Sequence, residues 1–263
     1  MDRLLHELYR SDFSLTGYDR YYFGLRYLGN RFLLSKLQKY LSDGRRVLDI
    51  GSGRLLISAT LAADGSAVTA LDLPEVFQDR TVRKRAQTYG IDLVGYRLRP
   101  GENHHLPFKD NHFSIILMSE VFEHLNFSPA GLLKEVRRVL ANGGLLILTT
   151  PNVHRIENKI NFFLGRSIYA DYQRYLVEAP YHYHWREFDS AELTGILQQF
   201  GFQLKETHFF NDVLVNRYSR YLFRSTSQKA KAYLKKMLYY PTRIWPGLRK
   251  QIIIVAASQA GIE

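Results

Sequence analysis

A turn with two glycines interrupts an apolar stretch of the chain, V-L-D-I-G-S-G-R-L-L-I-S from Val47 to Ser58. Gly51 and Gly53 have no Cβ, so a ligand can come close to the main chain at the start of the helix expected near Arg54. Asp72 ends the next apolar run, 21 residues after Gly51. A carboxylate at that place can accept hydrogen bonds from both hydroxyls of a ribose. The spacing therefore predicts a nucleoside-containing ligand, with a turn that binds nothing as the alternative.

Short apolar runs of strand length place this turn in an α/β pattern. Each run is followed by a helical pattern or a loop, as in βαβ units whose parallel sheet is buried on both faces. We expect five such strands, at Arg46–Gly51, Ala67–Asp72, Ile91–Leu98, Phe113–Ser119 and Leu145–Thr150. The sequence therefore predicts the α/β fold class.

The two ends of the chain depart from this alternation. Leu4–Leu41 has the pattern of two or more helices rich in Tyr, Phe and Leu. Near the other end, a helix expected at Ser190–Phe200 precedes two strand candidates, Phe202–Phe210 and Gln251–Ser258, which no convincing crossover helix connects. Two such strands pair most simply as an antiparallel couple at one edge of the sheet.

Two further stretches resemble motifs of the class I S-adenosylmethionine-dependent methyltransferases. Gly101 to Leu125 resembles the G-D-A-E-x-L-P-F motif, a strand and an E-H-L ending, and Leu132 to Asn152 resembles the E-x-x-R-V-L-K-P-G-G stretch with its T-P-N ending. The resemblance covers about residues 46–210, with Gln251–Ser258 as a seventh strand. It implies a Rossmann-like sheet of seven mostly parallel strands, with helices on both faces and an antiparallel terminal strand.

The resemblance also implies a division of the chain. A methyltransferase domain is expected over residues 46–263, after an N-terminal helical cap over residues 1–45. Within the domain we expect a lid insert at about 152–187 and a basic insert at about 211–250.

The cofactor that the resemblance implies is S-adenosylmethionine. It places Asp72 on the ribose, Leu73 against the adenine, and Glu102 on the adenine amino group, where the family usually has Asp. The residues that it places around the cofactor are Asp49, Gly51, Ser52, Gly53, Asp72, Leu73, Glu102, Asn103 and Ser119.

Three positions depart from the family's motifs. Leu55 stands where a third glycine is usual, Asn142 replaces a proline, and Ser114 replaces an aspartate. None of these changes removes a group that the chemistry requires, but Leu55 is expected to narrow the space over the cofactor's carboxylate.

The segment S-E-V-F-E-H-L supplies Glu120, Glu123 and His124 after the fourth expected strand. Its E-x-x-E-H pattern is similar to one that binds Mg²⁺ in ubiquinone-pathway O-methyltransferases and small-RNA 2′-O-methyltransferases, where the ion makes a hydroxyl more acidic. E-H-L at this place is also common in members that use no metal. Three roles stay open: Mg²⁺ ligands, a catalytic base or substrate contact from Glu123 and His124, or a structural role.

Further aromatic and histidine residues are candidates for the walls of the site. Pro180 to Phe202 resembles the element that leads from the family's lid into its last helix, so His182 and His184 can reach the acceptor or complete a metal site. A packed lid with hydrogen-bonded histidines is the alternative. Tyr18, Tyr21 and Tyr22 are candidates for an N-terminal cover or for core packing.

Composition limits the function classes. The 263 residues contain no cysteine, which excludes disulfides, thiolate metal sites and cysteine nucleophiles and favours a reducing compartment. Residues 1–10 lack the apolar core of a signal peptide, and no uncharged stretch reaches the length of about 20 residues that spans a bilayer. We therefore expect a cytoplasmic protein.

Most of the net charge of +11 lies near the carboxyl end. Residues 217–243 hold eight Lys or Arg and no acid, and Leu234, Met237 and Leu238 fall at helical spacing among them. Such a surface suits phosphate groups or anionic lipid, which predicts peripheral contact with the inner face of the membrane. We favour an anionic surface or substrate over RNA, and a solvated helical face is the alternative.

These patterns together predict an O-methyltransferase for a hydroxyl of a carbohydrate, glycolipid or secondary metabolite. The catalytic candidates are His124, Glu123 and His184, and the metal candidates are Glu120, Glu123 and His124. An RNA 2′-O-methyltransferase is the enzymatic alternative, and a catalytically silent partner protein that binds S-adenosylmethionine is the other.

Overall fold

The computed structural model describes residues 1–16, 20–41, 43–99, 104–169, 173, 176, 183–211 and 237–259. The helices named here are α1 (Asp2–Thr16), α2 (Arg20–Leu37), α3 (Leu56–Ala63), α4 (Arg80–Tyr89), α5 (Ala130–Val139), α6 (Ile156–Phe163) and α8 (Ser190–Gln199). The strands are β1 (Arg46–Ile50), β2 (Ala67–Asp72), β3 (Asp92–Gly95), β4 (Phe113–Ser119), β5 (Leu140–Pro151), β6 (Phe202–Phe210) and β7 (Gln251–Ser258).

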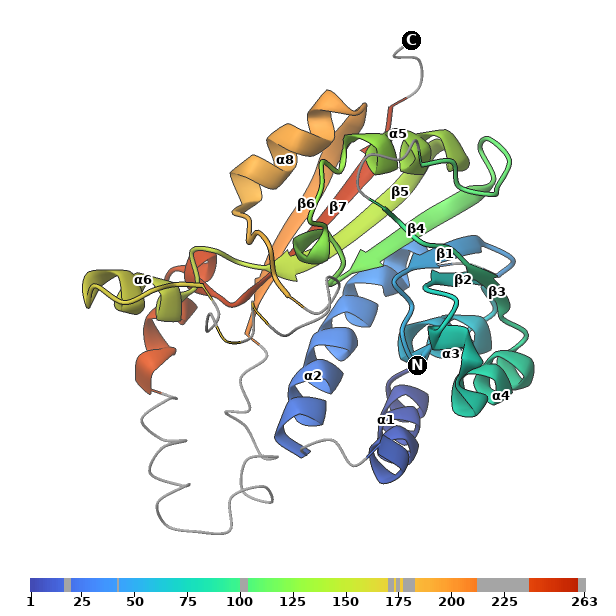
Figure 1. The fold of residues 1–263 in the computed structure, drawn as a ribbon, viewed down its shortest axis with the longest axis horizontal. Coiled ribbons are helices and arrows are strands. Elements are labelled where there is room, and N and C mark those ends of the chain that lie inside the picture. The colour runs from blue at the N-terminus through green and yellow to red at the C-terminus, as the bar shows by residue number, and fades with distance from the viewer. Residues whose placement is uncertain are drawn as a thin grey trace.

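Within the described residues, seven strands form one sheet in the order β3-β2-β1-β4-β5-β7-β6 (Figure 1). Strands β1 to β5 are parallel, and β7 runs antiparallel to both of its neighbours. The predicted fold class and the antiparallel terminal pair are confirmed. From β1 the chain adds β2 and β3 on one side of β1, and then β4 on the other side. In open α/β sheets, ligands bind outside the carboxyl ends of the strands at such a point.

The side chains of the central strands alternate between two cores. In β4, Ile116 and Met118 pack with the residues of α5 and α8, whereas Ile115 and Leu117 pack with α1 to α4. Helices therefore cover both faces of the sheet (Figure 1). Because successive side chains point to opposite faces and both faces are buried, every position of these strands favours an apolar residue. The strands are therefore continuous apolar runs in the sequence.

The N-terminal helices belong to one of these cores. Leu5 of α1 and Leu37 of α2 are fully buried with Val47 and Ile115 of the sheet. The predicted helical start of the chain is confirmed, and its helices pack on the sheet. The predicted boundary between residues 45 and 46 stays a prediction.

The largest differences from the expected boundaries are in the third strand, the fifth strand and α3. The third strand is shorter than Ile91–Leu98 because its only neighbour, β2, ends at Asp72, opposite Gly95. The fifth strand begins earlier than expected because Leu140 already pairs with Phe113. Helix α3 begins at Leu56, two residues after Arg54.

None of the described helices is long and apolar enough to cross a bilayer.

Candidate functional site

The turn after β1 lies against the loop that follows β4. The backbone N–H of Gly51 donates to the carbonyl of Leu71 at 2.8 Å, so the turn extends the pairing of β1 with β2. Gly51 has φ +73°, and a Cβ added there would lie 2.4 Å from Cγ2 of Val121. Only glycine fits at this contact, because a side chain would collide with Val121 and strain the backbone.

Asp72, the predicted ribose ligand, lies beside this turn. Its two carboxylate oxygens accept hydrogen bonds from the backbone N–H groups of Gly53 and Leu73, each at 2.7 Å. Burial raises the pKa of Asp72, and these two hydrogen bonds oppose the rise without cancelling it. Each oxygen has a second lone pair, so the carboxylate can accept ribose hydroxyls in addition.

Open space and a buried hydroxyl characterise the turn itself. A Cβ added at Gly53 would meet no atom within 4 Å. The hydroxyl of Ser52 is buried and has no hydrogen-bond partner among the residues that the structure describes. Because an unpaired buried polar group costs about 1–3 kcal/mol, the turn fits a ligand that brings hydrogen-bonding groups to it, as S-adenosylmethionine does with its carboxylate and ribose.

Leu55 occupies the position where a third glycine was expected. Its φ of 58° lies in the left-handed region, which costs a non-glycine residue about 1–2 kcal/mol. The side chain is fully buried in the core that contains Leu5 and Leu8 of α1. Burial of a leucine stabilises by about 1.5–3 kcal/mol, which offsets the strain. Leu55 therefore anchors the turn to the core that α1 helps to form.

A buried ion-pair network, which sequence reasoning missed, joins α1 to the same turn. Asp12 is fully buried and accepts hydrogen bonds from Nε of Arg54 at 2.7 and 2.6 Å, one with each carboxylate oxygen. It also pairs with Arg85 of α4 at 3.2 Å, and Arg54 pairs with Asp79 at 3.0 Å. Because these residues are far apart in the chain, no local spacing indicates the network.

Asp49 lies at the buried end of β1. Its carboxylate accepts a hydrogen bond from the hydroxyl of Ser58 in α3. Burial raises the pKa of Asp49 to about 7, although the Ser58 hydrogen bond lowers it, and the nearby charge of Asp72 adds to the rise. The predicted contact of Asp49 with the cofactor stays a prediction.

Residues at the end of β4 form hydrogen bonds with the end of β5. The hydroxyls of Ser119 and Thr149 lie 3.0 Å apart. Glu120 has φ +57°, and its carboxylate accepts hydrogen bonds from the Thr149 hydroxyl at 3.0 Å and the Gln251 amide at 3.2 Å. These contacts direct Glu120 toward β5 and β7.

Glu123, His124 and His184 form a group that could hold a metal ion. One ligand atom from each lies within 4.8 Å of the others. Glu123 is fully buried and accepts a hydrogen bond from the Thr150 hydroxyl at 3.1 Å, and the two histidine rings lie 4.8 Å apart in a T-shaped arrangement. The set differs from the predicted one, because Glu120 lies outside it and His184 takes the third place.

Backbone groups of the lid orient His124. Its Nδ1 lies 3.1 Å from the carbonyl oxygen of Tyr183. Because a carbonyl only accepts, Nδ1 carries the proton in this contact, and the neutral ring has its lone pair on Nε2. The N–H of Trp185 donates to the carbonyl of Glu123 at 2.8 Å, which fixes the lid to the same loop. His124 is thus arranged as a metal ligand or as a base.

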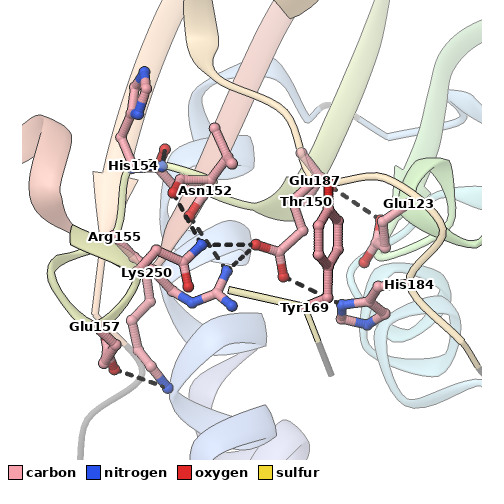
Figure 2. A network of polar contacts seen from close by, with 12 residues as sticks. Glu123, Thr150, Asn152, His154, Arg155, Glu157, Tyr169, His184, Glu187 and Lys250 are labelled. Atoms are coloured by element: carbon pink, nitrogen blue, oxygen red, sulfur yellow. Dashed lines mark hydrogen bonds and ion pairs between the residues drawn. The ribbon is translucent and has the colours of Figure 1, made fainter. Parts of the chain in front are cut away.

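An ion-pair cluster positions His184. Its Nδ1 lies 3.6 Å from Oε1 of Glu187, which also pairs with Arg155 and accepts a hydrogen bond from Asn158 at 3.2 Å (Figure 2). Burial raises the pKa of Glu187, but the hydrogen bond from His184 and the charge of Arg155 outweigh it, so this pKa lies below its usual range. The ionised carboxylate therefore holds the His184 ring in place. Sequence reasoning missed both Glu187 and Arg155.

Other predicted side chains lie outside the part of the molecule that the structure describes. Their roles stay predictions, and nothing in the structure places their side chains. They are Tyr18, Tyr21, Tyr22, Glu102, Asn103, His182 and, from the basic insert, residues 212–236.

Comparisons with known proteins agree on one family. A family model described as a methyltransferase domain matches residues 10–207. A probable S-adenosylmethionine-dependent methyltransferase of Mycolicibacterium smegmatis is 30% identical over 165 residues, which is 62% of this chain and 54% of that protein. A ubiquinone biosynthesis O-methyltransferase of Xylella fastidiosa is 31% identical over 182 residues, which is 67% of this chain and 69% of that protein. The chain thus spans about half the length of the mycobacterial relative.

Solved structures share the fold at lower identity. A putative sarcosine dimethylglycine methyltransferase of Galdieria sulphuraria has a TM-score of 0.57 and 17% identity, over 89% of this chain and 86% of that one. Phosphoethanolamine N-methyltransferase 2 of Haemonchus contortus, solved with S-adenosylmethionine, has a TM-score of 0.54 and 16% identity, over 89% and 52%. The predicted family and its cofactor are confirmed.

We predict that Asp49→Asn makes the stability of the protein less dependent on pH. The pKa of Asp49 rises from an ordinary 3.8 to about 7 on folding, so between these values the folded state holds a proton that the unfolded chain has lost. The free energy of unfolding of the wild type should therefore fall by up to about 1.4 kcal/mol per pH unit in this window. Urea unfolding of the cofactor-free protein from about pH 4 to 8 measures the slope, which the variant should lack.

The matched control is Asp92→Asn, because Asp92 is exposed at the start of β3. This variant should keep the wild-type dependence on pH. An Asp49→Asn slope equal to that of the control would contradict the role given to the buried carboxylate.

Proposed function

The chain belongs to the methyltransferase-domain family of S-adenosylmethionine-dependent enzymes, and from this premise we propose that it methylates a hydroxyl group. The observation that carries the proposal is the group of Glu123, His124 and His184 in the loop after β4 and in the lid. A carboxylate with two imidazoles suits the removal of a hydroxyl proton, either directly or through a bound cation. The relative named ubiquinone biosynthesis O-methyltransferase supports an oxygen acceptor.

In this proposal the turn after β1 and the end of β2 hold the cofactor. Asp72 accepts the ribose hydroxyls, Leu73 packs on the adenine, and Ser119 lines the methionine end. When bound, S-adenosylmethionine supplies a methyl group on a sulfonium, and its in-line transfer depends on alignment with the acceptor. The remaining cofactor contacts that we propose are those of Asp49, Gly51, Ser52, Gly53, Glu102 and Asn103.

The acceptor is proposed to lie beside the group of Glu123, His124 and His184. The lone pair on Nε2 of His124 takes the hydroxyl proton, and the buried carboxylate of Glu123 favours the protonated ring that results. His184, held by Glu187, contacts the acceptor.

A metal-dependent form of the same proposal uses the same three side chains. Two imidazoles and one carboxylate suit a transition metal such as Zn²⁺ better than the predicted Mg²⁺, which prefers oxygen ligands, and either cation would make the acceptor hydroxyl more acidic. Glu120 would have to leave Thr149 and Gln251 to join them.

The acceptor class that we propose is a carbohydrate, glycolipid or secondary metabolite with a lipid-linked portion. The basic insert at about 211–250 motivates this class and peripheral contact with an anionic membrane at its cytoplasmic face. RNA is the second candidate acceptor, because the same cations suit a phosphate backbone.

The first test is the cofactor affinity of Asp72→Ala. Loss of the charge-assisted hydrogen bonds to the ribose should weaken S-adenosylmethionine binding by about 1–3 kcal/mol in calorimetry. Asp64→Ala, at an exposed position after α3, is the control and should bind like the wild type. Unchanged affinity in a folded Asp72→Ala variant would remove Asp72 from the ribose site.

The second test separates the metal-dependent form from the base. If a cation is required, EDTA should abolish turnover, separate addition of Mg²⁺, Mn²⁺ or Zn²⁺ should identify the ion, and cofactor affinity should hardly change. If turnover persists in EDTA, His124→Ala should lower the rate by about 10² or more without weakening cofactor binding. A His124→Ala variant with full activity would contradict both forms.

The acceptor is tested by methyl transfer from labelled S-adenosylmethionine to a panel of soluble hydroxyl compounds. The panel contains sugars, phenols, glycolipid headgroups and an RNA oligonucleotide. We expect turnover of a sugar or phenol hydroxyl, because the proposed base acts on such protons. Turnover of RNA alone would establish the second candidate, and cofactor binding without turnover of any acceptor would indicate a catalytically silent protein.

A further inference from the structure

Large apolar side chains stand exposed on two segments that are distant in the chain. One segment is the end of α6 and the residues after it, and the other is the stretch 237–248 before β7. Phe163 is 88% exposed and Trp245 is 60% exposed, whereas such side chains are usually buried. The exposed apolar side chains of the two segments are Phe162, Phe163, Leu164, Tyr240, Ile244 and Trp245. Together with the cations described below, we call them the apolar–basic patch.

Polar contacts hold the two segments side by side. The side-chain amide of Asn152, just before α6, donates to the carbonyls of Gly247 at 2.7 Å and Arg249 at 2.8 Å. Nζ of Lys250 lies 4.0 Å from Oε1 of Glu157 in α6 (Figure 2). Figure 1 shows α6 next to the red segment that precedes β7, away from the helices that cover the sheet. The apolar side chains of both segments therefore belong to one end of the molecule.

The charges around these side chains have one sign. Lys159, Arg166 and Arg243 are exposed, and the Arg243 guanidinium lies 5.5 Å from the ring centre of Tyr240. Residues 156–169 and 237–250 contain a single acid, Glu157, and it contacts Lys250. Aromatic side chains interleaved with Arg and Lys are typical of surfaces that enter the headgroup region of an anionic bilayer.

The patch is connected to the proposed acceptor position. Arg155, at the start of α6, pairs with Glu187, and Glu187 contacts His184 (Figure 2). Two polar contacts, Arg155–Glu187 and Glu187–His184, thus connect the start of α6 with the group that is proposed to face the acceptor.

We propose that the apolar–basic patch docks on an anionic lipid bilayer and holds the lid at the membrane surface, where a lipid-linked acceptor is available. This inference rests on the proposed function, because it names the surface through which such an acceptor reaches the site. Phe162, Phe163 and Trp245 enter the interface, and Lys159, Arg166 and Arg243 pair with lipid phosphates.

A second copy of the chain fits this patch less well than a bilayer does. A two-fold symmetric interface packs a patch against itself. Lys159, Arg166 and Arg243 of one copy would then face the same cations of the other, and like charges at an interface repel. Anionic headgroups instead neutralise all three.

The test is sedimentation of the full chain with vesicles of phosphatidylglycerol and phosphatidylcholine in equal parts. The wild type should bind these vesicles, bind pure phosphatidylcholine weakly, and lose binding as salt is raised. Phe163→Ser combined with Trp245→Ser should weaken binding at least tenfold. Each of Lys159→Gln, Arg166→Gln and Arg243→Gln should weaken it about fivefold.

The matched control removes three exposed cations from other helices, by Arg80→Gln, Lys84→Gln and Lys134→Gln. Cations outside the patch attract the vesicle only at long range, where salt screens them. The control should therefore weaken vesicle binding by about twofold at most, far less than the patch variants do. Equal losses in control and patch variants, or no binding by the wild type, would overturn the proposal. A dimer in ultracentrifugation that only the patch variants disrupt would also overturn it.

Turnover of a soluble acceptor, measured without vesicles, separates this inference from the proposed function. The patch variants should keep wild-type turnover and cofactor affinity, because the residues proposed for the site include none of the patch residues. Soluble turnover without vesicle binding would refute the docking surface alone. Vesicle binding that depends on the patch, without turnover of any hydroxyl acceptor, would refute the proposed function and leave the surface in place.

Discussion

The contact between Gly51 and Val121 joins the two loops from which the candidate site is built. One loop follows β1 and the other follows β4, and these neighbouring parallel strands end at the same edge of the sheet. A side chain at position 51 would push the loops apart, since its Cβ would already lie 2.4 Å from Val121. The strand order brings the loops together, and glycine lets them touch. The turn after β1 and the loop that contains Glu123 therefore meet at this contact.

The N-terminal helices secure the other side of the turn after β1. The Asp12–Arg54 pair and the buried side chain of Leu55 both connect α1 to residues between β1 and α3. A turn that lacks the third glycine is thereby held by core packing and by a buried ion pair. Removal of one partner of such a pair leaves an uncompensated charge, which costs about 3–5 kcal/mol. Loss of α1 would consequently disturb the turn after β1 as well as the core.

The lid connects the chemistry to the surface. The backbone of the lid accepts and donates hydrogen bonds at His124 and Glu123, and its Glu187 holds His184. The same Glu187 pairs with Arg155, from which α6 begins. Polar contacts thus lead from the proposed acceptor position to the start of α6, the helix that carries part of the apolar–basic patch.

Sequence alone predicted most elements of the fold, and it is also the source of the residues that we propose for the cofactor half of the site. Strands β2, β4, β6 and β7 lie at their predicted residues, because a strand buried on both faces is a local apolar run that a periodic pattern reveals. Gly51, Gly53 and Asp72 are proposed for a related reason, since the ligand they suit requires particular residue types at fixed places after two strands.

Tertiary structure decided the partners of each polar side chain. The sequence motif offers Glu120, Glu123 and His124 equally as metal ligands. In the structure, Glu120 instead contacts Thr149 and Gln251. His184 from the lid lies beside the other two. Asp12 pairs with Arg54 across 42 positions, and α6 is fixed to Lys250 across 93. Local pattern determines which residues form a strand or a turn, because backbone conformation depends on near neighbours. Contacts between distant side chains depend on how the strands are ordered and the loops folded, and only the assembled molecule fixes that arrangement.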